Sequence, residues 1–226
     1  MLESVYFGAL LSLAGYGIGV LLKKKKDFAL FNPLLIAIII CIVILKVCNI
    51  SYDAYYNGAK YISYLLTPAT ICLAVPLYEQ MQALKDNFFA IIIGIITGVL
   101  STMISILALC LIFRLDHIGY VTLLPKSVTT AIGMGISEEL GGYVSITVAI
   151  IILTGILGNM MAKTICRIFH ITEPVAKGIG IGSASHAIGT VKAMEMGQVE
   201  GAMSSLSIVI SGLLTVVAAS IFSLII

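Results

Sequence analysis

Residues 88–113, FFAIIIGIITGVLSTMISILALCLIF, contain no charged side chain and exceed the roughly 20 residues that an α-helix needs to cross a bilayer core. Hydrophobic residues make up 60% of the chain and charged residues only 11%, whereas soluble domains carry about 25% charged residues. The sequence therefore predicts an all-α, polytopic integral membrane protein, in a single transmembrane domain over 1–226. Six full transmembrane helices are expected, because further apolar runs occupy residues 5–22, 31–45, 61–78, 143–162 and 201–226.

The basic side chains predict how these helices are oriented. The KKKKD cluster at 23–27 follows the first apolar run, which is the wrong order for a cleaved signal peptide. Because Lys and Arg gather on the cytoplasmic side, we expect this cluster inside and the N-terminus outside, in the inner (cytoplasmic) membrane of a cell. If 115–142 and 170–200 both enter the bilayer and return, nine of the 13 Lys and Arg residues lie inside, and if both cross, only five do. The charge distribution favours two re-entrant segments.

The two segments also resemble each other in sequence. At an offset of 56 residues, six of the 15 positions in 127–141 are identical to those in 183–197. We interpret them as an internal repeat with units at about 120–168 and 176–226. Each unit would hold one re-entrant segment and one crossing, so the two copies would point in opposite directions. Inverted repeats of broken helices are typical of secondary transporters, whose substrate sites lie near the bilayer midplane.

The first segment, IGYVTLLPKSVTTAIGMGISEELGG at 118–142, places Pro125 and Lys126 among apolar residues. Proline and glycine free backbone groups from helical pairing, which a bilayer tolerates only where protein, water or a ligand satisfies them. A lysine in such a place usually faces a partner or a substrate, so Lys126 is a candidate ligand for a carboxylate. The alternative is that Lys126 extends along apolar protein to the outer headgroups. Neutral donors predicted to bind substrate beside it are Ser127, Thr129 and Thr130.

The second segment, GIGIGSASHAIGTVKAMEMG at 178–197, places His186 among small and hydroxylated residues. Histidine titrates near neutrality, so a protonated His186 would bind a carboxylate or relay a coupling proton. The alternative is a neutral His186 that ties two helices together by hydrogen bonds. The glycines lack the GK[ST] ending of a nucleotide-binding loop, so nucleotide binding is not expected. Further residues predicted to bind substrate here are Ser183, Ser185, Gly189 and Thr190.

Other polar features of the chain receive weaker assignments. Thr67 and Pro68, in YLLTPATICLAVPLYEQ at 64–80, are further substrate-binding candidates, although a kink for packing explains Pro68 equally well. The five cysteines lack metal-ligand spacing and no nucleophile motif is present, so we expect no metal, no cofactor, no enzyme activity and no nucleic-acid partner. Candidate gates, or sites for a coupling H⁺ or Na⁺, are Glu138, Glu139, Glu195 and Glu200, with solvated membrane-edge carboxylates as the alternative.

Five motifs along essentially the whole chain resemble the LrgB family, also called CidB. They are NPLL (32–35), LLTPATICLAVPLYEQ (65–80), LPKSVTTAIGMGISEELGG (124–142), TGILG (154–158) and GSASHAIGTVKAMEMGQVEGAMSSL (182–206). One departure is Ala131, where the family usually has proline after the paired threonines.

The resemblance implies two different roles. Bacterial members are described as partners of a small holin-like membrane protein of the LrgA or CidA type, which influence murein hydrolase activity and autolysis. A plant relative is a plastidial glycolate/glycerate translocator, and bacterial pairs are linked to pyruvate uptake. The residues favour a secondary transporter of small carboxylates such as glycolate, glycerate, pyruvate or lactate, because a pore former has no need of duplicated polar segments. The alternative is a holin- or antiholin-like regulator of murein hydrolases, and a homodimer is the default oligomer.

Overall fold

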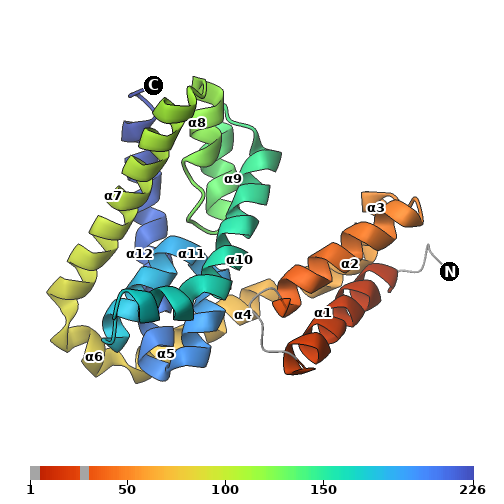
Figure 1. Ribbon diagram of the computed structural model, residues 1–226, viewed down its shortest axis with the longest axis horizontal. Coiled ribbons are helices and arrows are strands. Elements are labelled where there is room, and N and C mark those ends of the chain that lie inside the picture. Colours follow the sequence, from red (N-terminus) through yellow and green to blue (C-terminus); the bar gives the residue numbers. More distant parts are fainter. Residues whose placement is uncertain (1–5, 26–30) are drawn as a thin grey trace. The chain divides into compact units, whose positions relative to one another are not determined.

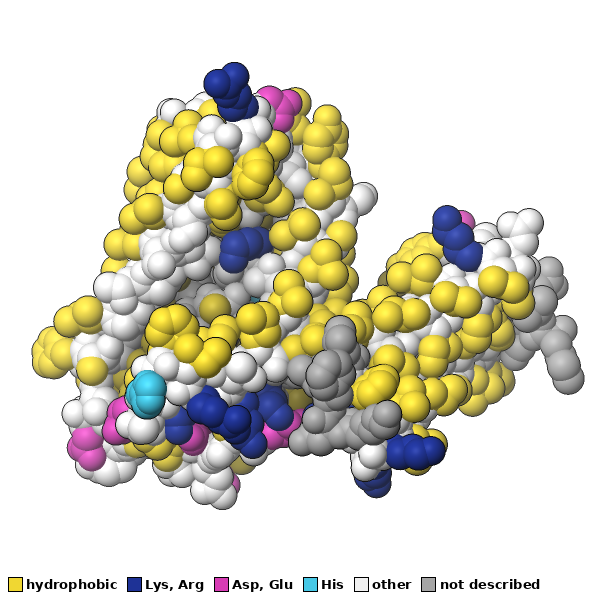
Figure 2. Space-filling model, viewed as in Figure 1, with side chains coloured by type: hydrophobic (Ala, Val, Ile, Leu, Met, Phe, Trp, Pro, Cys, Tyr) yellow, Lys and Arg dark blue, Asp and Glu magenta, His cyan; other side chains and the backbone are white. Residues whose placement is uncertain are grey.

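The computed structural model describes residues 6–25 and 31–226, and over these residues it is helical and without strands (Figure 1). The chain divides into two compact units, residues 1–72 and 73–226. Four of the described helices are long and apolar enough to cross a membrane, and large apolar side chains are exposed on their surfaces (Figure 2). This agrees with the prediction of an all-α membrane protein.

The first unit contains α1 (Phe7–Lys25), α2 (Pro33–Val47), α3 (Tyr52–Ser63) and α4 (Leu66–Cys72). Glycines bring α1 close to its neighbours: a Cβ on Gly15 would lie 3.2 Å from Ala37 Cα, and one on Gly19 would lie 2.7 Å from Pro33 Cα. Asn32 caps α2, since its side-chain oxygen accepts from Leu34 N at 2.9 Å. At 15 residues, α2 is shorter than the roughly 20 residues of a straight span.

The apolar run predicted at 61–78 does not form one continuous helix, although Tyr52–Ser63 and Leu66–Glu79 together are apolar enough for one bent span. Helix α3 ends at Ser63, and α4 and α5 (Ala74–Glu79) follow as separate short helices. Pro68 and Pro76 each stand at the third position of one of these short helices. Proline has no N–H to donate and is tolerated in the first turn of a helix, so each proline favours a new helix start over one continuous helix.

The second unit contains three long helices: α7 (Phe88–Phe113), α10 (Val144–Ile168) and α12 (Gln198–Phe222). They agree with the apolar runs predicted at 88–113, 143–162 and 201–226. Figure 1 shows that α7 and α12 run from the lower to the upper end of this unit, whereas α10 runs downward. On α7 every third or fourth residue is buried, which gives one packed stripe and leaves the rest of the surface apolar and exposed. The buried stripe comprises Ile91, Ile95, Val99, Met103, Ile106 and Cys110.

Shorter helices complete this unit. Helix α6 (Met81–Asp86) precedes α7 at the lower end. Helices α8 (His117–Leu123) and α9 (Thr130–Glu139) lie between α7 and α10 in the chain, and α11 (Pro174–Met196) lies between α10 and α12. Tyr120 of α8 donates its hydroxyl to the Phe222 carbonyl at 3.0 Å, which places the start of the α8–α9 segment beside the upper end of α12.

Candidate functional site

Helix α11 is broken in the middle, at His186. The backbone of His186 has φ 43° and ψ −145°, a conformation that a non-glycine residue adopts only at a cost on the order of 1–3 kcal/mol. Before the break, Gly178 packs on Glu200 and Gly182 on Ser204, so this limb runs parallel to α12. After the break, Thr190 bonds Ser204 at 2.7 Å and Met194 packs on Gly201, so the second limb runs antiparallel. The chain therefore reverses at His186, and both ends of α11 lie at the lower end of the unit.

Helices α8 and α9 form a second hairpin, which enters from the upper end. One buried hydroxyl ties both of its limbs to the start of α10: Thr147 Oγ1 donates to the Thr122 carbonyl at 2.8 Å and lies 2.7 Å from Ser137 Oγ. The Tyr143 amide also donates to Thr122 Oγ1, at 2.8 Å. The loop 124–129 forms the tip of this hairpin, and α9 begins at Thr130 after an extended Thr129. The turn at His186 falls 56 residues after Thr130, which is the offset at which 127–141 and 183–197 share six identical positions.

Ile151 of α10 contacts both hairpins. Its side chain packs where Gly133 of α9 lacks a Cβ, and its carbonyl oxygen accepts a hydrogen bond from His186 Nε2 at 2.9 Å. Because a carbonyl oxygen only accepts, Nε2 carries the proton of the neutral ring and Nδ1 carries none. This bond ties α11 to α10, as expected from the alternative interpretation of a neutral His186 that joins two helices.

A cavity of about 350 Å³ lies between the first limb of α11 and α10, and the tip of the α8–α9 hairpin reaches into it. Lys126 lines this cavity from the tip, Ser185 from the turn of α11, and Thr154 from α10. The Lys126 ammonium donates to Ser127 Oγ at 3.1 Å. Lys126 also lies within electrostatic reach of His186. The structure thus brings Lys126, at the tip of the α8–α9 hairpin, to the turn of α11.

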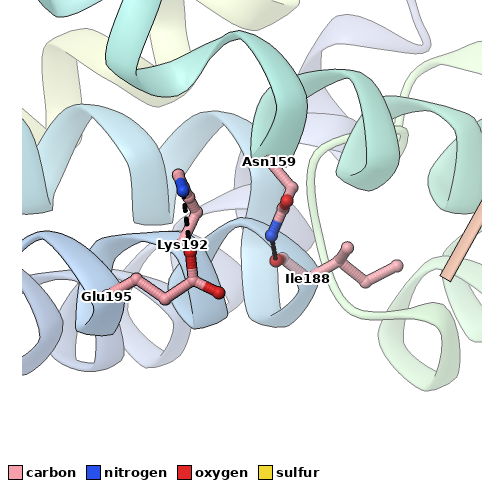
Figure 3. Close-up of polar contacts among 4 residues, drawn as sticks. All are labelled: Asn159, Ile188, Lys192 and Glu195. Carbon is pink, nitrogen blue, oxygen red and sulfur yellow. Dashed lines mark hydrogen bonds and ion pairs between the residues drawn. The ribbon is translucent and has the colours of Figure 1, made fainter. Parts of the chain in front are cut away.

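The shape of α10 fits the turn of α11. A Cβ on Gly155 would lie 2.7 Å from His186 Cε1, and one on Gly158 would collide with Ser185. One residue further, Asn159 Nδ2 donates to the Ile188 carbonyl at 2.9 Å (Figure 3). Sequence reasoning missed Thr154 and Asn159. The signal for Asn159 is the i, i+3, i+4 spacing, which places Gly155, Gly158 and Asn159 on one face of a helix.

Several candidates brace the turn and do not line the cavity. Ser183 donates to the Ile179 carbonyl at 2.7 Å and faces Gly98 of α7. Thr190 donates to the His186 carbonyl at 3.0 Å, and Gly189 packs against Ser185. Residues Thr129 and Thr130 form the half-buried start of α9. Thr67 and Pro68 lie in α4, which belongs to the first unit.

The candidate carboxylates lie toward the ends of the second unit. Glu138 and Glu139 are exposed at the end of α9. Glu195 is exposed and pairs with Lys192 at 2.7 Å (Figure 3), while Glu200 is buried and lies 3.8 Å from Lys177. The placement of Glu138 and Glu139 fits the membrane-edge interpretation. Glu195 and Glu200 lie at the lower end of the unit, where α11 ends and α12 begins.

Long apolar helices that enclose two helical hairpins, with a lysine and a histidine at the hairpin tips, define a polytopic α-helical membrane protein with broken helices. The chain belongs to the LrgB-like family, which matches residues 12–225. It is 39% identical over 218 residues to the antiholin-like protein LrgB of Bacillus cereus (strain B4264). The aligned stretch covers 96% of this chain and 95% of the Bacillus cereus protein. The same identity and coverage hold for the antiholin-like protein LrgB of Bacillus anthracis (strain CDC 684 / NRRL 3495). No solved structure matches the chain.

Proposed function

We propose that this protein is a secondary transporter of small carboxylates such as glycolate, glycerate, pyruvate or lactate. The observation that carries the proposal is the cavity of about 350 Å³ to which the two broken segments contribute Lys126 and Ser185. A lysine in an apolar setting needs an anionic partner, and Glu138, Glu139, Glu195 and Glu200 lie toward the ends of the unit. A carboxylate that arrives from solution supplies the missing charge.

The hairpins add further attraction for an anion. Helix α9 and the second limb of α11 both begin at a break, so their N-terminal ends, which carry partial positive charge, lie at the hairpin tips. The hydroxyls of Ser185 and Thr154 line the same cavity and would bind the remaining oxygens of a hydroxy- or keto-acid. In this proposal His186 holds the turn through Nε2 and takes up a coupling proton at Nδ1, while Lys126, Ser185 and Thr154 contact the substrate, because the buried His186 does not line the cavity. Na⁺ coupling is the alternative.

The same proposal includes a membrane topology. Hairpin α8–α9 with α10 forms one repeat, and α11 with α12 forms the other in the opposite direction. The lower end of the second unit is placed in the cytoplasm, because Lys163, Arg167, Lys177 and Lys192 gather there, whereas Arg114 follows α7 at the upper end (Figure 2). We further propose that the protein lies in the inner membrane with the N-terminus outside, six crossings and two re-entrant hairpins, in which α2 and the bent pair of Tyr52–Ser63 with Leu66–Glu79 supply two of the six crossings.

Transport is tested directly with purified protein in proteoliposomes. Uptake of labelled glycolate, pyruvate and lactate is measured with and without a co-reconstituted LrgA-type protein, which we propose as a partner, and under imposed H⁺ or Na⁺ gradients. The proposal expects saturable uptake of at least one of the three acids. If none is taken up under any of these conditions, the protein is not a transporter of this class.

A second candidate function is supported by two relatives, which are named antiholin-like proteins. In that case the protein would regulate murein hydrolases together with its partner, and a homodimer is one arrangement for such a regulator. The two functions make opposite predictions for Lys126→Ala and His186→Ala. A regulator with no transport role keeps its control of autolysis in both variants as long as they insert, whereas control exerted through transported acids is lost.

A further inference from the structure

A second and larger cavity, of about 580 Å³, opens at the lower end of the second unit. We call it the vestibule and define it by six charged residues that line it: Lys163, Arg167, Lys177, Lys192, Glu195 and Glu200. They come from the end of α10, from both ends of α11 and from the start of α12. The vestibule therefore exists only because α11 returns to the end at which it began.

The charges of the vestibule do not cancel. Lys177 lies 3.8 Å from Glu200, and Lys192 lies 2.7 Å from Glu195, so two of the four cations face a carboxylate. Lys163 and Arg167 remain as an excess of two positive charges. They stand four residues apart on α10, where like charges repel one another, and an anion between them would relieve that repulsion.

The vestibule adjoins the inner cavity that holds Lys126. Cys166, Ile171 and Lys177 line both cavities. On the upper side, Tyr120, Val121 and Leu124 of the α8–α9 hairpin are fully buried, and Thr147 bonds the Thr122 carbonyl behind them. The two cavities thus adjoin, with Lys163 and Arg167 in the vestibule, Lys177 in the shared wall and Lys126 in the inner cavity.

We propose that the vestibule is a second anion-binding site, at which a small carboxylate from the aqueous phase binds between Lys163 and Arg167. From there the anion moves past Lys177, where it competes with Glu200, and reaches Lys126. The second step depends on the proposed transport function, whereas the binding step does not. An aqueous carboxylate fits better than the phosphate headgroup of an anionic lipid, which has similar chemistry, because the vestibule leads inward to a cavity with room for a small acid.

Because the sequence contains no tryptophan, the fluorescence of a single introduced tryptophan reports on its own surroundings. Thr172 is exposed and lines the vestibule, so Thr172→Trp in the full chain gives a single fluorophore there. In phosphatidylcholine nanodiscs, glycolate is expected to change its fluorescence saturably. Replacing the excess cations, in Lys163→Gln/Arg167→Gln, should raise the apparent Kd about tenfold or more, since each lost charge pair weakens anion binding. Lys85→Gln, exposed on α6 and outside the vestibule, is the matched control and should leave the Kd unchanged.

A second measurement does not depend on the reporter. Equilibrium dialysis of the otherwise unmodified protein with labelled glycolate should find two sites for each chain. One site should remain in Lys126→Gln and one in Lys163→Gln/Arg167→Gln. Because this measurement uses protein without the introduced tryptophan, it tests the number of sites even if the tryptophan variant fails to fold.

The possible outcomes separate the vestibule from the transport proposal. If glycolate binding needs Lys163 and Arg167 but no acid is transported, the vestibule is supported and transport is wrong. If acids are transported but the vestibule cations can be removed without effect on binding, the vestibule proposal is wrong and transport stands. A fluorescence change that appears only when phosphatidylglycerol is added, with no response to glycolate, identifies a lipid headgroup as the occupant and overturns the proposal.

Discussion

His186 Nε2 lies 2.9 Å from the carbonyl oxygen of Ile151, so the turn of one broken helix is held by the middle of its neighbour. Ile151 is fully buried, and its side chain fills the space beside Gly133 in the other hairpin. One residue of α10 therefore fixes the separation of both hairpin tips. In the transporter proposed above, a shift of α10 would move the two tips together and so change access to the site between them.

Replacement of Lys126 by glutamine should nearly abolish carboxylate uptake. The substitution keeps a polar side chain of similar length and removes the charge that faces the cavity. Loss of one partner of a buried charge pair costs about 2–5 kcal/mol, which corresponds to a decrease of about 30-fold or more in the uptake rate at low substrate. Proteoliposome flux measures this, with Lys85→Gln as the charge-matched control. Equal uptake by Lys126→Gln and the control would remove Lys126 from the site.

The long helices were predictable from sequence because lipid imposes a simple rule, a long apolar run without charges. The runs at 88–113, 143–162 and 201–226 became α7, α10 and α12 with ends within a few residues, apart from an extension of α10 to Ile168. The division of the run at 61–78 into short helices was not predicted, because average hydropathy ignores where prolines stand. Pro68 and Pro76 each favour a new helix, and that is a local effect which an apolar average hides.

The broken segments were found through glycine, proline and the 56-residue offset, but the exact contacts were not. Ser183 and Ser185 look equivalent in sequence, yet Ser183 faces α7 and Ser185 faces the cavity. Their directions differ because residues two apart on an α-helix face nearly opposite sides, and the sequence does not show which side meets the cavity. Asn159 was missed because a lone asparagine in an apolar helix has no sequence signal until its partner, the Ile188 carbonyl, is placed.

Gly158→Ala should destabilise the second unit and reduce uptake. An added Cβ would collide with Ser185, and such overpacking typically costs about 1–3 kcal/mol. Gly135→Ala is the matched control, since a Cβ on Gly135 of α9 meets nothing within 4 Å and should stabilise that helix by roughly 0.5–1 kcal/mol. Thermal unfolding in detergent compares the two. A melting temperature for Gly158→Ala at or above that of the wild type would mean that α10 and α11 are not packed as described.

The backbone at His186 predicts an unusual order of stability among variants. At φ 43° and ψ −145° glycine fits with little strain, asparagine is strained, and the β-branched valine is strained most. His186→Val should therefore be less stable than His186→Gly, by at least about 1 kcal/mol, with His186→Asn between the two. Urea or thermal unfolding of the three variants, each made in the full chain, measures the order. Three variants of equal stability would indicate that α11 continues as a regular helix through residue 186.

Cysteine accessibility tests whether both ends of α11 lie on one side of the membrane. In a background without the five native cysteines, single cysteines at positions 177 and 195 should react with an impermeant maleimide from the cytoplasmic side, because both positions line the vestibule. Cysteines at positions 114 and 138 should react from the opposite side, because they follow α7 and end α9 at the upper end. A helix that crossed fully would place positions 177 and 195 on opposite sides. Since the vestibule and the inner cavity both need the chain to reverse at His186, opposite labelling of this pair would remove the basis for a carboxylate site at that turn.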